Sequence, residues 1–135
     1  MPEWLLSEKL AELLYDDHAA SDPGVYALAI DVPDGGVETL ARDWLDHYPA
    51  TPPYLRTLVD AERVIYVGAA KNVRARIEDH LQGDVRKASL PRVWGVSDVV
   101  RVWWFEDADR AFEREHGLAM DLDHDTDVGT YVHSR

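Results

Sequence analysis

The stretch Val64–Leu81, VIYVGAAKNVRARIEDHL, decides the fold of this chain. It opens with four β-branched or aromatic residues, Val64–Val67, which predict a strand. Gly68 then permits a tight turn, and Asn72 is a favourable N-cap residue, so we expect a helix to begin at the next position. The stretch therefore predicts a strand, a turn and a helix in immediate succession.

Two polar side chains lie on the apolar stripe of that helix. Val73, Ile77 and Leu81 recur every four residues, and Arg76 and His80, each three residues after one of them, share their face. Burying a guanidinium beside an imidazole costs desolvation energy unless an anion meets them. That anion is either a phosphate, which would make the pair functional, or one of the chain's own carboxylates, which would make it structural.

A second stretch, GVYALAID at 24–31, places Tyr26 in an earlier predicted strand, Val25–Asp31. The ordered set Gly-Val-Tyr, Tyr-Val-Gly, then an asparagine, an arginine and a histidine spaced four residues apart resembles the GIY-YIG nuclease family. The resemblance runs from Gly24 to about Leu122, which is most of the chain.

The resemblance implies an α+β fold in which helices flank a small, mainly antiparallel three-stranded sheet. Val99–Phe105 supplies the third strand, and the chain adds an N-terminal helix over Trp4–His18 within residues 1–20. We expect one domain over 1–135, with 82–96 as an irregular connection. The family usually joins its first two strands by a short hairpin, whereas here an insert at 32–62 intervenes. This insert either caps the fold or shapes access of the substrate.

The family also requires a glutamate on a later helix, here Ala108–Leu122. Glu115 lies on the apolar stripe of this helix, whereas Glu113 lies off it, so Glu115 is the first candidate and Glu113 the alternative. The resemblance assigns Glu115 to a single Mg²⁺ or Mn²⁺ ion that is held mostly through water. Several members carry an asparagine after this helix. In this chain Thr130 or His133 could take its place.

The resemblance also assigns roles in phosphodiester hydrolysis. Arg76 would bind the scissile phosphate through its fork of donors. Tyr26 would activate or position the attacking water, and Tyr66 and His80 would complete the site, although the spacing leaves open which of the three takes the proton. The predicted catalytic residues are Tyr26, Tyr66, Arg76, His80 and Glu115, and the predicted substrate-binding residues are Lys71, Asn72, Arg74, Arg86 and Lys87.

The formal charge of −12 is the opposite of what nucleic-acid binding favours. The bases are unevenly placed, however, because the segment 71–101 holds seven of the fourteen and only four acids. High Asp and Glu with three lysines is typical of a halophilic protein, and in molar salt the Debye length is about 3 Å, so general repulsion is screened. We therefore expect the segment 71–101 to face DNA.

The remaining sequence narrows the cellular context. No apolar run approaches the roughly 18 residues of a membrane span, the N-terminus lacks the layout of a signal peptide, and the chain has no cysteine, so we expect a cytoplasmic protein without membrane partners. The segment Asp121–Arg135 begins with DLDHDTD. Val128 occupies the place where a calcium-binding loop needs glycine directly after its third acidic position, so a solvated acidic turn is expected.

Together these patterns predict a metal-dependent endonuclease that hydrolyses DNA, guided to its substrate by structure or by a partner protein. One alternative is a catalytically inactive GIY-YIG-like domain that binds DNA or a protein through the same groove. The other is a small acidic adaptor protein. The type of DNA substrate is left open.

Overall fold

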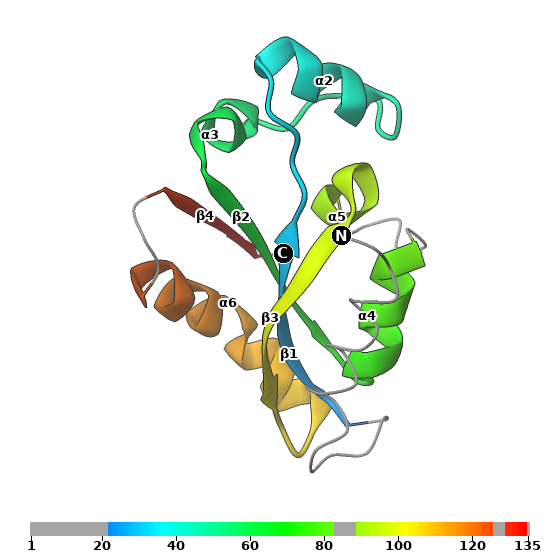
Figure 1. Cartoon of the computed structure of the whole chain (residues 1–135). Coiled ribbons are helices and arrows are strands. Elements are labelled where there is room, and N and C mark those ends of the chain that lie inside the picture. The colour runs from blue at the N-terminus through cyan, green and yellow to red at the C-terminus, as the bar shows by residue number, and fades with distance from the viewer. Residues whose placement is uncertain (1–21, 83–88, 126–128, 135) are drawn as a thin grey trace.

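Four strands form one mixed sheet in the computed structural model, which describes residues 22–82, 89–125 and 129–134. The strands are β1 (Gly24–Ile30), β2 (Arg63–Ala70), β3 (Val96–Trp104) and β4 (Thr130–Ser134), in the spatial order β3-β1-β2-β4 (Figure 1). β1 pairs antiparallel with both β2 and β3, while β4 pairs parallel with β2. The α+β class is confirmed.

The prediction of a three-stranded antiparallel sheet is wrong, because β4 adds a fourth strand in parallel orientation. The acidic turn predicted for the stretch DLDHDTD is wrong as well for its described residues, 121–125, which are helical. The preceding helix continues to Asp125, and Thr130–Ser134 then pairs with β2, which would otherwise be an edge strand with unpaired backbone groups. The predicted N-terminal helix, Trp4–His18, lies outside the described residues.

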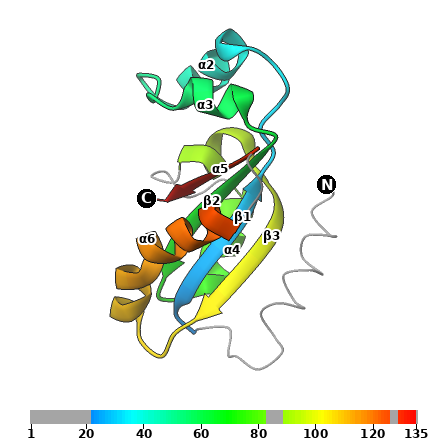
Figure 2. The ribbon, with the colours of Figure 1, turned by 90° about the vertical axis from the view of Figure 1, so that its left-hand side faces the viewer.

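Helices cover both faces of the sheet. In Figure 2, α6 (Ala108–Asp125) lies in front of the sheet and α4 (Val73–Gln82) behind it. α5 (Ser89–Trp94) packs on the same face as α4 and replaces part of the irregular connection predicted for 82–96.

Because side chains alternate along each strand, each face has its own core. The first core, between the sheet and α4 and α5, comprises Tyr26, Leu28, Ile30, Leu40, Trp44, Leu55, Leu58, Val64, Tyr66, Ala70, Val73, Ile77, Leu90 and Val99. The second core, between the sheet and α6, comprises Val25, Ala27, Ile65, Val67, Ala69, Ala111, Leu118 and Ala119.

The insert between β1 and β2 forms two helices, α2 (Val37–Leu45) and α3 (Leu55–Asp60). Both helices bury apolar side chains in the first core, as the membership of Trp44 and Leu58 shows. The Nε1–H of Trp94 donates a 3.0 Å hydrogen bond to Oδ2 of Asp43, which ties α5 to α2. The insert therefore caps one end of this core.

The turn predicted at Gly68 falls later, at Lys71 and Asn72, because β2 continues through Gly68 to Ala70. Oδ1 of Asn72 accepts a 3.0 Å hydrogen bond from the backbone N–H of Ala75, which is the expected N-cap geometry. Gly68 lies opposite Tyr26 in the β1–β2 register, and a Cβ at this position would approach Cζ of Tyr26 to 2.6 Å. A glycine is required here because the tyrosine ring crosses directly over its backbone.

Candidate active site

Three of the predicted catalytic side chains meet in the first core. Tyr26 from β1 and His80 from α4 form a 2.7 Å hydrogen bond between the phenol oxygen and Nε2 of the imidazole. Tyr66 from β2 lies on the same face of the sheet, with its ring centroid 5.6 Å from that of His80 in an edge-on arrangement. The order of the strands and the packing of α4 on the sheet thus bring together residues that are far apart in sequence.

This group is enclosed by the protein. Tyr26 and Tyr66 are each 1% exposed and His80 is 2% exposed. The phenol oxygen of Tyr66 and Nδ1 of His80 are likewise shielded from solvent. A phosphate at the surface therefore does not contact these atoms directly in this conformation.

Arg76 lies one turn before His80 on α4 and is half-buried, as expected for a cation on the edge of the apolar stripe. The other predicted substrate-binding residues are placed differently. Lys71 is exposed, Asn72 is engaged as the helix cap, and Nε of Arg74 lies 3.1 Å from Oε1 of Glu78 in a surface ion pair. Arg86 and Lys87 lie outside the described residues.

Glu115 lies on the opposite face of the sheet. It is one helical turn from both Ala111 and Ala119, which pack in the second core, and its Oε1 atom is buried. Glu113, the alternative ligand, is exposed. α6 therefore brings neither carboxylate to the Tyr26–His80 pair.

The position of Glu115 bears on whether the predicted site can hold a divalent ion. Mg²⁺ keeps several waters and can be held by a single carboxylate. Within the described ranges, however, no three His, Asp or Glu side chains gather closely enough to hold a metal. A metal at Glu115 would be separated from Tyr26 and His80 by the sheet. The described donors do not fit a metal shared with this pair, and no chemical step below runs through one.

β4 brings a further histidine to the site. His133 lies opposite Tyr66 in the parallel register, and the two rings stack with centroids 6.0 Å apart. The imidazole also contacts Tyr54, which precedes α3 in the insert, at a centroid distance of 4.8 Å. The hydroxyl of Tyr131 lies 3.0 Å from Nδ1 of His133. Of the two proposed replacements for the family's asparagine, His133 is the one beside Tyr66. Thr130 pairs with Arg63 at the start of the strand.

Sequence analysis did not select Tyr54 or Tyr131 as site residues. The pattern Tyr131-x-His133 places both side chains on one face of a strand, and this was the available signal once a strand was assigned. Tyr54 carried no comparable signal, because its position depends on how the insert packs. Its hydroxyl lies 3.3 Å from Oγ of Ser89 in α5, which helps to fix the ring over His133.

Burial sets the protonation states around His133. Desolvation lowers the pKa of His133 below its ordinary value of 6.5, so the imidazole is neutral at pH 7. Desolvation also raises the pKa of Tyr131, with a further contribution from Tyr54. The pKa of Tyr54 is raised by burial and partly lowered again by the hydrogen bond to Ser89. These three groups are therefore uncharged near neutral pH.

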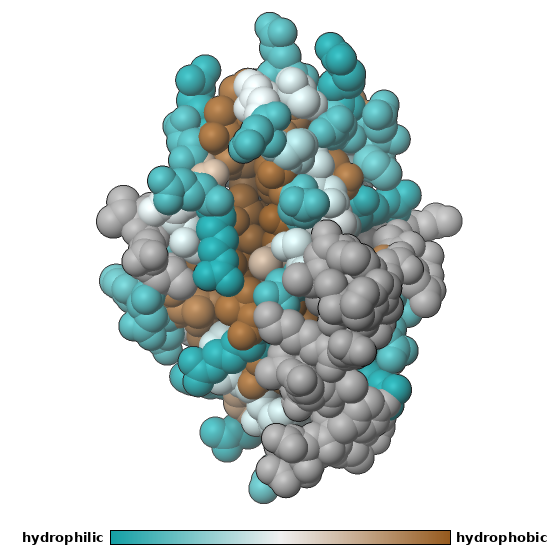
Figure 3. All heavy atoms as spheres, viewed as in Figure 1, coloured by the Kyte–Doolittle hydropathy of each residue, from teal (hydrophilic) through white to brown (hydrophobic). Residues whose placement is uncertain are grey.

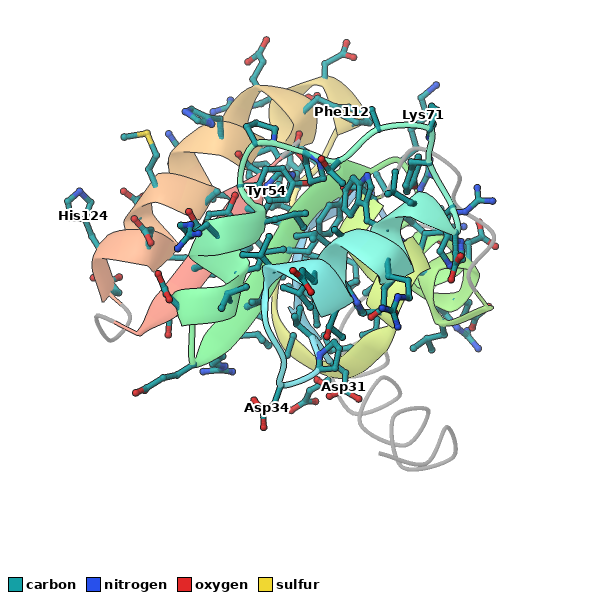
Figure 4. The ribbon with its side chains drawn as sticks, turned by 90° about the horizontal axis from the view of Figure 1, so that it is seen from above. Asp31, Asp34, Tyr54, Lys71, Phe112 and His124 are labelled. Atoms are coloured by element: carbon teal, nitrogen blue, oxygen red, sulfur yellow. The ribbon has the colours of Figure 1, made fainter. Side chains whose placement is uncertain are left out.

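A separate hollow of about 620 Å³ lies at the other end of the sheet, between the insert and the strand ends. Its lining includes apolar residues such as Leu58 and Val64, and five carboxylates: Asp31, Asp34, Asp60, Glu62 and Asp98. Figure 3 shows apolar side chains in the middle of this face of the molecule, bordered by hydrophilic ones. Asp31 and Asp34 lie at one edge of the molecule and Lys71 at the opposite edge (Figure 4). A polyanion is not expected to bind in this acidic hollow.

Comparison of the chain with protein-family models, curated proteins and solved structures gives no match. Among the described residues, no helix combines the length and the hydropathy needed to cross a bilayer.

Proposed function

We propose that this protein is an endonuclease of the GIY-YIG type that hydrolyses phosphodiester bonds in DNA. The observation that carries the proposal is the 2.7 Å hydrogen bond between Tyr26 and His80, with Tyr66 on the same face of the sheet. Apolar packing alone does not call for three polar side chains in one core, because each polar atom must be hydrogen-bonded to offset its desolvation. A catalytic site that transfers protons does require such polar side chains.

In this proposal Arg76 binds the scissile phosphate. A guanidinium presents paired N–H donors that match two phosphate oxygens, and its charge offsets the negative charge that builds up during attack by water. Arg76 is half-buried at the edge of α4, where a phosphate can reach it from solvent. The buried Tyr26–His80 pair and Tyr66 lie behind it and hold the inner wall of the site.

Nicking of supercoiled plasmid and cleavage of a four-way junction test the proposal, each measured with Mg²⁺, Mn²⁺ or EDTA in low and molar KCl. We expect the unmodified protein to cut at least one substrate. Arg76→Ala should lower the rate by about 10²–10³, the usual effect of removing a donor that stabilises developing charge. Arg42→Ala is the matched control, because Arg42 is exposed on α2, away from the proposed site.

The same assay decides the predicted role of a metal. If Glu115 holds a catalytic ion, EDTA and Glu115→Ala should each abolish cleavage while Glu113→Ala does not. Equal rates in Arg76→Ala and Arg42→Ala, with both variants folded by circular dichroism, would rule out the proposed phosphate site.

A second candidate function is a non-catalytic domain that binds DNA or a protein. The burial of Tyr26, Tyr66 and His80, together with the location of Glu115 across the sheet, favours this alternative. It predicts that the unmodified protein binds the junction in a gel-shift assay without cutting it. Charge reversal at Arg86 and Lys87 should then weaken binding more than reversal at Arg42 and Arg56.

A further inference from the structure

The two features that depart from the GIY-YIG pattern, the insert and β4, meet at His133. The imidazole packs against Tyr54 of the insert and Tyr66 of β2, at centroid distances of 4.8 and 6.0 Å. A ring that packs against two other rings loses rotational freedom, so the direction of its nitrogens is restricted before any substrate binds. A ring that only filled space would not need such orientation.

One nitrogen of His133 is anchored and the other is available. The 3.0 Å contact with the hydroxyl of Tyr131 engages Nδ1. Among the residues that the structure describes, no other hydrogen bond reaches this ring, and the side chain is half-buried rather than enclosed. Anchoring one nitrogen of a histidine sets the tautomer and directs the other nitrogen at its reaction partner. In the tautomer that this inference requires, Nδ1–H donates to the hydroxyl of Tyr131 and Nε2 is left as a proton acceptor.

His133 also differs in exposure from the other proton-carrying side chains of the site. Tyr26, Tyr66 and His80 are enclosed, so a water at the surface cannot come within hydrogen-bond reach of them. A general base must make that contact. The half-buried His133, stacked on Tyr66, is the member of this group that is open to solvent.

We propose that His133 is the general base of the phosphodiester hydrolysis proposed above, on which this inference rests. Nε2 removes a proton from the attacking water as the water oxygen forms a bond to phosphorus. The bond between phosphorus and the leaving nucleotide oxygen breaks, and that oxygen takes a proton from solvent. His133 then releases its own proton to solvent, so that one water and one diester give a phosphomonoester and a hydroxyl group.

The surroundings of His133 agree with this role. The groups that face it are the phenols of Tyr54, Tyr66 and Tyr131, and no carboxylate is among its contacts in the described residues. Without a carboxylate to stabilise the imidazolium, burial lowers the pKa of His133 and keeps it ready to accept a proton at pH 7. Of these facing elements, the insert supplies Tyr54. It thus shapes the site as well as capping the core.

The test is the pH dependence of cleavage by the full chain, using whichever of plasmid or four-way junction the unmodified protein cuts. For the unmodified protein, kcat/KM should fall as pH decreases through the lowered pKa of His133, because protonation removes the base. His133→Gln should lose at least about 100-fold in rate at pH 7.5 and no longer show this acid limb. His124→Gln, which changes an exposed histidine on α6, is the matched control and should behave like the unmodified protein.

Tyr131→Phe keeps the ring and removes the anchor. In the required tautomer the hydroxyl accepts from Nδ1–H and stabilises the imidazolium, so its loss should move the acid limb to lower pH with a smaller loss of rate. NMR titration of the His133 ring gives a readout that does not depend on activity, and its midpoint should lie below 6.5. His133→Gln identifies the resonance.

Each outcome decides a different point. An unchanged rate and acid limb in folded His133→Gln would overturn the role of His133 while the nuclease stands. A His133 titration midpoint above 7 would overturn it as well, since the ring would then be protonated at neutral pH. No cleavage of either DNA by the unmodified protein would overturn the proposed function and this inference together.

Discussion

Gly68→Ala is the most direct test of how β2 and β1 position Tyr26. The new methyl group would clash with the phenol oxygen of Tyr26 and would lie 2.6 Å from Cζ and 3.0 Å from Cε2. An ordinary contact begins at about 3.4 Å, so the ring must move by close to 1 Å in a core that leaves it 1% exposed. The ring cannot make this move and keep its hydrogen bond to His80.

The expected loss of stability has two causes, the overpacking of the core and the loss of the hydrogen bond to His80. Overpacking a core by one methyl group typically costs about 1–3 kcal/mol, and a lost buried hydrogen bond about another 1 kcal/mol. Gly68→Ala should therefore lower the free energy of unfolding by about 2–4 kcal/mol, or the melting temperature by roughly 6–20 °C. Urea unfolding in molar KCl, monitored by tryptophan fluorescence, measures the change in the free energy of unfolding. The m-value should be the same for both proteins.

Gly117→Ala is the matched control. Gly117 lies inside α6, and a Cβ there would meet nothing within 4 Å. This change should raise the free energy of unfolding by up to about 1 kcal/mol, because alanine favours a helix over glycine. If Gly68→Ala is as stable as the unmodified protein, the reasoning about Tyr26 is wrong. In a Tyr26→Phe background, which removes the nearest atom, Gly68→Ala should cost less by about 0.5–3 kcal/mol.

Three further changes test separate parts of the site. Tyr26→Phe removes the 2.7 Å hydrogen bond to His80 and should cost about 1–3 kcal/mol in urea unfolding, whereas a cost near zero would mean that the bond contributes nothing. Asn72→Ala removes the cap of α4 and should lower the free energy of unfolding by about 1 kcal/mol, whereas Asn72→Asp keeps a capping oxygen and should lose little. Equal losses in both variants would contradict the capping role of Asn72. His133 has a folded-state pKa below 6.5, so the unfolded chain binds its proton first and stability is lost as pH falls from 6.5 through the folded value. His133→Gln should therefore lose less stability than the unmodified protein between pH 7.5 and pH 5.5. An identical loss in both proteins would refute the lowered pKa of His133.

The fold was predictable where local signals and packing agree. Val64–Val67 has strong strand formers and Asn72 is a good cap, and both predictions are confirmed by β2 and by the hydrogen bond to Ala75. β4 was not predictable in the same way. Its five residues follow an acidic segment, and what makes them a strand is the open edge of β2, a partner more than sixty positions away in sequence.

In the candidate site, too, the local sequence pattern predicted some positions and tertiary packing decided the others. Helical spacing correctly placed His80 on the buried face of α4, and the strand pattern placed Tyr26 and Tyr66. Spacing also placed Glu115 on the inward face of α6, which the structure confirms. It could not say which side of the sheet that helix covers. This choice depends on the path of the chain after β3.

The position of β4 at the edge of the sheet has a consequence for the order in which the protein opens. β4 has one strand neighbour, is five residues long and is half-buried along its whole length, whereas every residue of β1 is buried between two strands. Segments with few buried contacts open at a lower free energy than the global transition, so backbone amides of β4 should exchange with solvent faster than those of β1. His133 is carried on this edge strand. Mild denaturant should therefore dismantle the proposed proton acceptor while the rest of the sheet remains folded.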